Sequence, residues 1–198
     1  PVGDPAPPGA PPTKLPQVFF LWAPLHFDTR CTHAGIFENE HGVQWHWDGM
    51  IMPTYADPKD LPGVEDPRME PLAAVEHRLE FVPGTRRARH AVITLVDLTG
   101  ARTEIDLEPL LLYRMKGIGY SHPEWGHGKW KGELAIGGES WKIEDADEKD
   151  LSNQHIQQVV RAKATGPNGL ETGVGVLEQI HLGPHRRYGF KDFMGPAS

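Results

Sequence analysis

Cysteine is nearly absent from this sequence, and long apolar runs are missing. The chain has 198 residues and a single cysteine, Cys31, so it can form neither an internal disulfide nor a cysteine-rich zinc site. Such a composition is typical of a reducing compartment, and we expect a cytoplasmic protein. The densest apolar run, Leu110 to Tyr113, is far shorter than the roughly 20 residues of a membrane helix, so we expect no membrane span.

Positive charge is scarce as well. The chain has 20 Lys and Arg against 27 Asp and Glu, which gives a net charge of −7. Proteins that bind nucleic acid need clustered Lys and Arg to displace counterions from phosphates. The basic cluster from Arg86 to Arg89 falls at a predicted turn and is typical of a solvated loop. We expect no nucleic-acid partner.

Helical periodicity is also missing, and a period of two takes its place. From Val75 to Leu107 apolar and polar residues alternate, with turns at 83–85 and 98–100. This alternation is typical of strands with one buried face, so the segment is predicted to be a three-stranded meander. Only 145–153 could form a helical turn, and it has no apolar stripe.

The same alternation predicts strands along most of the remaining chain, roughly ten in all. Their ranges are 17–23, 31–38, 43–52, 109–116, 130–136, 140–145, 154–164 and 173–182. Antiparallel strands joined by short turns need a sandwich or a closed barrel to hide their edges. We therefore predict an all-β fold, either an antiparallel barrel or a strongly curved β-sandwich, with the barrel favoured.

Proline marks the segments outside this barrel. Residues 1–16 hold seven prolines and two glycines, which favours an extended arm or linker. Residues 57–71 form a second proline-rich stretch, between two strand-rich segments. We predict one barrel domain over 17–198, with 57–71 as a loop.

The stretch YSHPEWGHGKW, residues 120–130, concentrates groups that could carry chemistry. Its polar members, Tyr120, His122, Glu124 and His127, are predicted to lie near the barrel mouth, with Trp125 at a structural corner. The two histidines do not have the spacing of a known zinc motif, so no metal is predicted. No dinucleotide or phosphate-binding motif occurs either, and we expect no cofactor.

Three polar residues fall on apolar strand faces. By spacing, His77 shares a predicted strand face with Val75 and Leu79, Glu178 shares one with Val174 and Ile180, and Gln158 shares one with Val160. Burying such groups without partners costs several kcal/mol. Two explanations remain open, namely a satisfied core network, or a cavity in which burial raises the pKa of a carboxyl group that acts as a general acid.

Aromatic residues suggest a surface for a flat or long apolar ligand. Trp45 and Trp47 share one face of the predicted strand 43–52, and this face could pack on the core or line a lumen. Trp130, Phe81 and Gln158 are the other candidate ligand-binding residues.

Three stretches together resemble a known family. They are FFLWAPLHFDTRCTHAGIFE, GIGYSHPEWGHGKWKGEL and GVGVLEQIHLGPHRRYGF. They resemble the C-terminal half of uncharacterised bacterial proteins related to the carotenoid 1,2-hydratase and AttH-like superfamily. The resemblance implies lipocalin-like barrels, usually two in one chain, and water addition, isomerisation or cyclisation of terpenoid-type substrates. Here only one barrel is expected, with the proline-rich segment where another would connect.

The sequence thus predicts a barrel that binds a hydrophobic, terpenoid- or lipid-like molecule. If it is an enzyme, we expect a cofactor-independent lyase (hydratase) or isomerase. His122 or Glu124 would then donate a proton, and His77 or Glu178 would accept one. The alternative is a non-catalytic ligand-binding barrel, or a structural domain that pairs with another barrel or with a second copy of the chain. An enzyme should show titratable side chains around an apolar cavity, and a structural domain a lumen filled by its own side chains.

Overall fold

The computed structural model describes residues 17–63, 68–117, 122–126 and 128–196, and its regular structure is almost entirely β. The strands are β1 (Val18–Trp22), β2 (Leu25–Phe27), β3 (Arg30–Glu38), β4 (Gln44–Pro53), β5 (Glu70–Phe81), β6 (Ala88–Asp97), β7 (Arg102–Arg114), β8 (His155–Gly166) and β9 (Gly169–Leu182). Short 3-10 helices are η1 (Pro58–Asp60), η2 (Ile143–Asp145), η3 (Leu151–Asn153) and η4 (Arg186–Tyr188). The prediction of an all-β fold is confirmed. The arm predicted at 1–16 lies outside the described residues.

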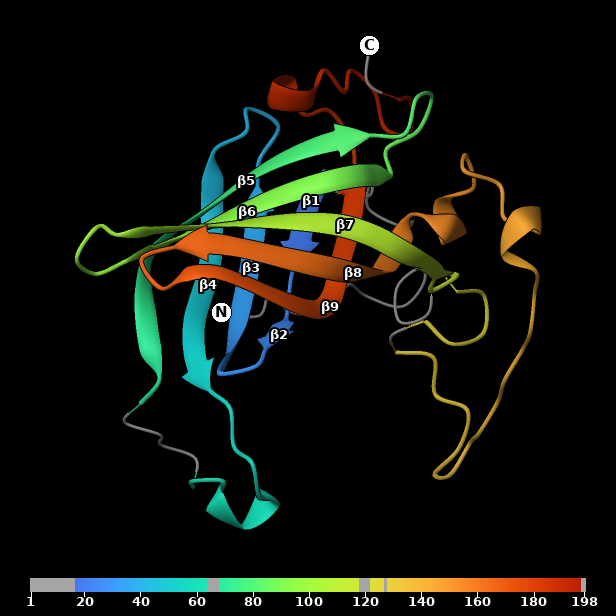
Figure 1. The fold of residues 1–198 in the computed structure, drawn as a ribbon. Coiled ribbons are helices and arrows are strands. Elements are labelled where there is room, and N and C mark those ends of the chain that lie inside the picture. The colour runs from blue at the N-terminus through green and yellow to red at the C-terminus, as the bar shows by residue number, and fades with distance from the viewer. Residues whose placement is uncertain (1–16, 64–67, 118–121, 127, 197–198) are drawn as a thin grey trace.

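The strands close into one antiparallel barrel (Figure 1). Each strand from β3 to β9 pairs with its sequence neighbour, and β1 returns to pair with β9. Both β1 and β2 lie between β3 and β9, so they form one strand interrupted at Ala23 and Pro24. The barrel therefore has eight strand positions, one of which is shared by β1 and β2. Its closure removes the free edges that an open sheet would expose.

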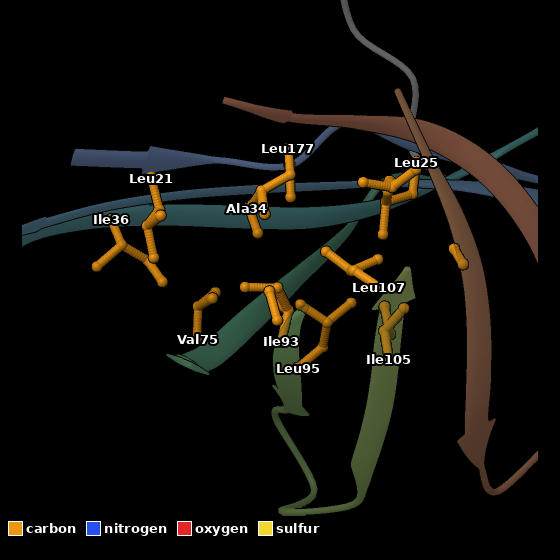
Figure 2. Close-up of a cluster of buried hydrophobic side chains, with 14 of the residues drawn as sticks. Leu21, Leu25, Ala34, Ile36, Val75, Ile93, Leu95, Ile105, Leu107 and Leu177 are labelled. Carbon is orange, nitrogen blue, oxygen red and sulfur yellow. The ribbon is translucent and has the colours of Figure 1, made fainter. Parts of the chain in front are cut away.

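The inward side chains fill the lumen with one continuous apolar cluster. Figure 2 shows Leu21, Ile36, Ile93 and Leu107 meeting there from strands that are distant in sequence. Each of these side chains is almost completely buried. Burying one Leu, Ile or Phe side chain contributes about 1.5–3 kcal/mol, so this packing is the main stabilising feature of the barrel.

The side chains of β9 that point into the barrel are not those predicted from the alternation. Its buried residues Leu177, Gln179 and His181 point inward, while Val174 on the other face is exposed. The two inward positions directly before Leu177 are Gly173 and Gly175, and a Cβ at Gly175 would collide with the backbone of the β1–β2 strand. Because glycine there permits close contact between backbones, the apolar alternation of the valines marks the outer face.

The long connection between β7 and β8 lacks the strands predicted at 130–136 and 140–145. In the described part of this segment, the regular elements are η2 and η3, close to the helical turn expected at 145–153. The physical reason is that β7 and β8 already pair with each other along most of their length. A closed barrel leaves no edge for additional strands to join.

The seam between β4 and β5 is short. Its ladder consists of Met50 opposite Pro71 and Ile51 opposite Glu70. Farther along the seam, Gln44 Nε2 donates to the Val75 carbonyl oxygen at 3.0 Å. The barrel is thus closed partly by a side chain at this place. Within the described residues, no helix is long and apolar enough to span a membrane.

Candidate functional site

A pocket of about 750 Å³ lies beside the barrel, between the end of β7 and the long β7–β8 connection. In Figure 1 this connection is the yellow-to-orange segment at the side of the barrel. The pocket is lined by Tyr113, His122, Glu124, Trp125, Ala135, Ile136, Gly137, Gly138, Glu139 and Trp141. Its volume is in the usual range for small-molecule sites, about 300–1,000 Å³.

His122 is the most buried titratable residue of this pocket, with 8% of its surface exposed. Its Nδ1 accepts two backbone hydrogen bonds, from the amides of Glu124 at 3.1 Å and Trp125 at 3.0 Å. Nε2 faces Glu139 Oε1 at 3.2 Å. Because Nδ1 is an acceptor, the network assigns the ring proton to Nε2, which donates to Glu139.

Three aromatic rings form much of the pocket wall, and two lysines lie against these rings. Lys131 Nζ lies 5.2 Å from the centre of the Trp125 ring, and Lys116 Nζ lies 5.0 Å from that of Trp141. These are cation–π distances. Tyr113 adds a third ring, tilted against Trp141 with centroids 6.3 Å apart. The pocket thus offers flat apolar surfaces with charges at their margins.

The two carboxylates of the pocket differ in their environment. Glu124 Oε2 lies 3.1 Å from Lys131 Nζ. This hydrogen bond lowers the pKa of Glu124, so it is ionised near neutral pH and has no proton to donate. Glu139 accepts from His122, and its Oε2 lies 3.9 Å from Lys116 Nζ. Glu139 is therefore the carboxylate of this pocket that the His122 imidazole holds in place.

A second titratable cluster lies at the barrel end covered by the C-terminal segment. Glu38 Oε1 is 2.7 Å from His77 Nε2, and Glu38 Oε2 is 2.8 Å from His185 Nε2. Tyr188 Oη lies 3.0 Å from His77 Nδ1 and accepts from the amide of Leu79. A consistent assignment has the tyrosine hydroxyl donating to Nδ1 and a neutral His77 donating from Nε2 to the carboxylate.

Burial and hydrogen bonding act in opposite directions on this cluster. Burial alone would raise the pKa of Glu38, but hydrogen bonds from His185 and His77 outweigh it and lower the pKa to about 2. Burial lowers the pKa of His77 despite its carboxylate partner, which agrees with the neutral imidazole. The hydrogen bonds therefore hold an ionised Glu38 beside a neutral His77.

Phe19 lies at the centre of this cluster. Its ring stacks on His181 with centroids 4.4 Å apart and on His185 at 4.2 Å. A polar pocket of about 470 Å³ at the β4–β5 seam reaches Glu38 and His77. The polar groups of the cluster mostly bond to one another, which matches the satisfied core network considered from the sequence.

The other candidate acid–base residue, Glu178, is not near His77. It lies on the outer face of β9. There its Oε1 is 2.7 Å from His155 Nε2, and its Oε2 is 2.7 Å from Gln157 Nε2. Gln158 is buried in the core, where its Nε2 donates to the Ala88 carbonyl oxygen at 3.0 Å. The structure therefore brings His122 and Glu124 together in one pocket and places His77 and Glu178 in two other environments.

The candidate ligand-binding aromatics are also dispersed. Trp47 packs on the core, but a bulge at Glu38 turns Trp45 to the outer face, where it contacts Phe37 and is 65% exposed. The prediction that the two tryptophans share a face is therefore wrong for Trp45. Phe81 packs edge-on against the C-terminal segment. Trp130 is exposed outside the pocket lining, and Tyr120 and His127 lie outside the described residues.

Sequence reasoning missed Glu139 and Trp141, which complete the pocket, and Glu38 and His185, which complete the buried cluster. Glu38 had a usable signal, since it continues the inward alternation of Ala34 and Ile36. Glu139 had none, because it stands in a predicted hairpin turn that does not form.

Comparison with known proteins gives a family and a distant structural similarity. No curated protein matches the chain. The crystal structure of kievitone hydratase from Nectria haematococca is similar at 11% identity and a TM-score of 0.41. The similarity covers 83% of this chain and 40% of that one, so this chain spans less than half of the hydratase. A family model, described as a family of unknown function (DUF8625), matches residues 1–191. This chain is therefore a member of the DUF8625 family.

Proposed function

We propose that the pocket beside β7 binds a small apolar molecule, and that Glu139 moves a proton on it while His122 positions the carboxylate. The observation that carries this proposal is the His122–Glu139 pair in a pocket walled by Trp125 and Trp141. Titratable side chains around an apolar pocket are the arrangement expected of an enzyme rather than a structural domain. The lumen is filled by its own side chains, as expected of the structural alternative, so the proposed ligand is assigned to the side pocket.

The roles follow from the hydrogen bonds. The Nδ1 lone pair of His122 is used by two backbone amides, so the ring is held in one orientation with Nε2–H toward Glu139. Glu139 Oε would remove a proton from a carbon next to an alkene or carbonyl group and return it to another carbon of the same molecule. This sequence conserves all atoms and is an isomerisation by double-bond shift, without a cofactor.

The ligand class is a terpenoid- or lipid-like molecule with a flat unsaturated part. Tyr113, Trp125 and Trp141 supply faces for such a group, and Ile136 adds aliphatic surface. Ordered aromatic contacts contribute about 0.5–1.5 kcal/mol each beyond the burial of their area. The proposal therefore predicts modest affinity spread over several rings.

Binding can be tested with anilinonaphthalene sulfonate as an apolar fluorescent probe. Replacing Trp141→Leu should weaken probe binding about fivefold or more, since one aromatic contact is lost. Trp130→Leu is the matched control, because Trp130 is exposed and outside the pocket lining. If both variants bind the probe like the wild type, the probe does not occupy this pocket and the binding proposal is rejected.

Proton transfer can be tested separately in heavy water. A panel of terpenoid alkenes and enones is incubated with the protein, and deuterium uptake is measured by mass spectrometry. Uptake should disappear in Glu139→Gln and persist in Glu133→Gln, an exposed glutamate of the same segment. If Glu139→Gln retains the uptake and the probe affinity, the catalytic role is rejected while binding is retained.

A second function has its own supporting observation. Trp130, Leu134 and Ile136 are 80%, 90% and 95% exposed, and Leu111 on β7 is also exposed. Large apolar side chains gathered on one side of a protein are typical of interaction surfaces. A second copy of the chain could cover them, as the non-catalytic alternative requires. The oligomeric state of wild type and Leu134→Glu, measured by light scattering, tests this: a dimer lost in the variant would support it.

A further inference from the structure

Three potential ligands for a soft metal ion lie side by side on the outer face of the sheet, at the barrel end opposite the C-terminal segment. His26 on β2 pairs with Cys31 on β3, and Cys31 pairs with Met52 on β4. Directly opposed residues of antiparallel strands point to the same face with Cβ atoms about 4.5–5.5 Å apart. Their neighbours Leu25 and Ile51 pack on the core, so the row itself points outward.

A pocket of about 590 Å³ covers this row. It is lined by His26, Cys31, Met52, Pro53, Thr54, Tyr55, Leu61, Pro62, Gly63 and Met69. None of these lining residues carries a carboxylate or a permanent positive charge. The row therefore lies in mainly apolar surroundings, under the connection between β4 and β5.

The distance between the first two ligands is close to that of a metal chelate. Cys31 Sγ lies 3.1 Å from His26 Nδ1. With metal–sulfur and metal–nitrogen bonds of about 2.3 and 2.0–2.1 Å, two ligands on one tetrahedral ion are about 3.6 Å apart. A movement of about half an ångström would therefore let an ion replace the hydrogen bond.

We propose that His26, Cys31 and Met52 form a binding site for a soft monovalent cation, Cu(I). Thiolate and thioether sulfur atoms are the ligands that select Cu(I) among the biological metals, and imidazole also suits copper. One thiolate and one monovalent ion make a neutral complex, which suits a pocket whose lining, as far as the structure describes it, has no carboxylate and no permanent positive charge. A divalent ion would leave a net positive charge there, which none of the described lining residues offsets with a carboxylate.

The donor set separates this site from those of harder ions. Among the residues that the structure describes, no group of three or more His, Cys, Asp or Glu side chains is placed to hold a metal ion. The third donor here is the Met52 thioether, which zinc and magnesium sites rarely use.

Metal binding should also release a proton. Since the thiolate is the form that binds metal, formation of the sulfur–copper bond transfers the thiol proton to the solvent. About one proton should appear for each ion bound.

The test is an anaerobic titration of the full chain with Cu(I), with bicinchoninate as the competing chelator. We expect one ion per chain, and one proton released per ion in weakly buffered solution. Loss of an outer-shell partner already costs about 10–100-fold in metal affinity. Cys31→Ser, His26→Gln and Met52→Leu should therefore each cost about 100-fold or more. Zn(II) should bind far more weakly than Cu(I).

Met50→Leu is the matched control. Met50 is two residues before Met52 on the outer face of the same strand, but it pairs with His33 and does not line the pocket. Its replacement should leave Cu(I) affinity unchanged. Absence of binding to the wild type would overturn the proposal. So would affinity that depends on Cys31 but not on His26 or Met52, since this would be binding to a thiol alone.

Discussion

Glu38 Oε1 lies 2.7 Å from His77 Nε2, and both side chains are withdrawn from solvent. Glu38→Gln places an amide NH2 opposite one of the two imidazole N–H donors, and leaving such a buried donor unsatisfied typically costs about 1–3 kcal/mol. Glu38→Gln should therefore lower the free energy of unfolding by an amount in this range, measured by urea denaturation at pH 7. Glu40→Gln, an exposed neighbour, is the control. An unchanged urea midpoint for Glu38→Gln would show that the pair is not stabilising.

The same residue should make the protein sensitive to strong acid. The pKa of Glu38 is about 2 in the folded protein, below the ordinary value of 4.5. The ionised form is thus favoured by folding, and its contribution is complete above pH 4.5 and is lost as the pH falls toward 2. We expect wild type to lose stability more steeply than Glu38→Gln in this window, as measured by thermal midpoints at successive pH values.

His181 should act at higher pH. Complete burial lowers its pKa to about 3, from an ordinary value of 6.5, so the folded state keeps the ring neutral while the unfolded chain takes up a proton. Stability should therefore fall as the pH drops from 6.5 toward 3, by up to about 1.4 kcal/mol per pH unit. His181→Phe should reduce this slope between pH 6.5 and 4.5, above the range in which Glu38 titrates.

A residual slope is expected from His77, whose pKa burial also lowers. His41→Phe is the control, since His41 is an exposed histidine on a turn. Urea denaturation at pH 7, 6 and 5 gives the slope of unfolding free energy against pH for the wild type, His181→Phe and His41→Phe. Equal slopes for wild type and His181→Phe would mean that His181 does not govern this pH range.

Two adjacent glycines should respond differently to the same change. A Cβ at Gly137 would collide with the Trp125 ring, whereas one at Gly138 would meet open space. Gly137→Ala should displace this wall of the pocket and weaken binding of the apolar probe, while Gly138→Ala should leave it unchanged. Because Trp125 lies outside the core cluster, the thermal midpoint should fall by only a few degrees. Equal effects at both positions would contradict the placement of Trp125.

Arg86 should hold the C-terminal segment in place. It donates three hydrogen bonds of 2.7 Å, to the carbonyl oxygens of Gly183, Asp192 and Gly195. Arg86→Met keeps the aliphatic stem but removes these donors, so it should cost about 3 kcal/mol or more. Trypsin should then cut faster after Lys191. Arg89→Met, at an exposed arginine of the same hairpin, should change neither quantity.

The barrel could be predicted because its signals are local. The alternation from Val75 to Leu107 depends on immediate neighbours, and it correctly gives β6, most of β5 and the first part of β7. Alternation misled where a neighbouring backbone sets the face. At Gly175 the inward position has no side chain because the backbone of the β1–β2 strand lies against it. At Trp45 a single bulged residue shifts the side chain to the other face.

The site was predictable only in part. His122 and Glu124 stand in a conspicuous motif, and the structure places both in one pocket. The buried cluster around Glu38 could not be inferred, because its contacts span long stretches of chain. Glu38 and His185, for example, are 147 positions apart. No local pattern relates two such residues, since their proximity depends on closure of the barrel.

The position of β1 has a consequence for the order in which the molecule can form. A ribosome releases β1 long before β9, yet Val18 is paired with Leu182 and the strand lies between β3 and β9. During synthesis β1 can pair with β3, but its other edge has no neighbour until nearly the whole chain has emerged. Closure of the barrel and docking of the Arg86 hairpin on the last residues are therefore late events. The nascent protein must keep one strand edge from pairing elsewhere until then.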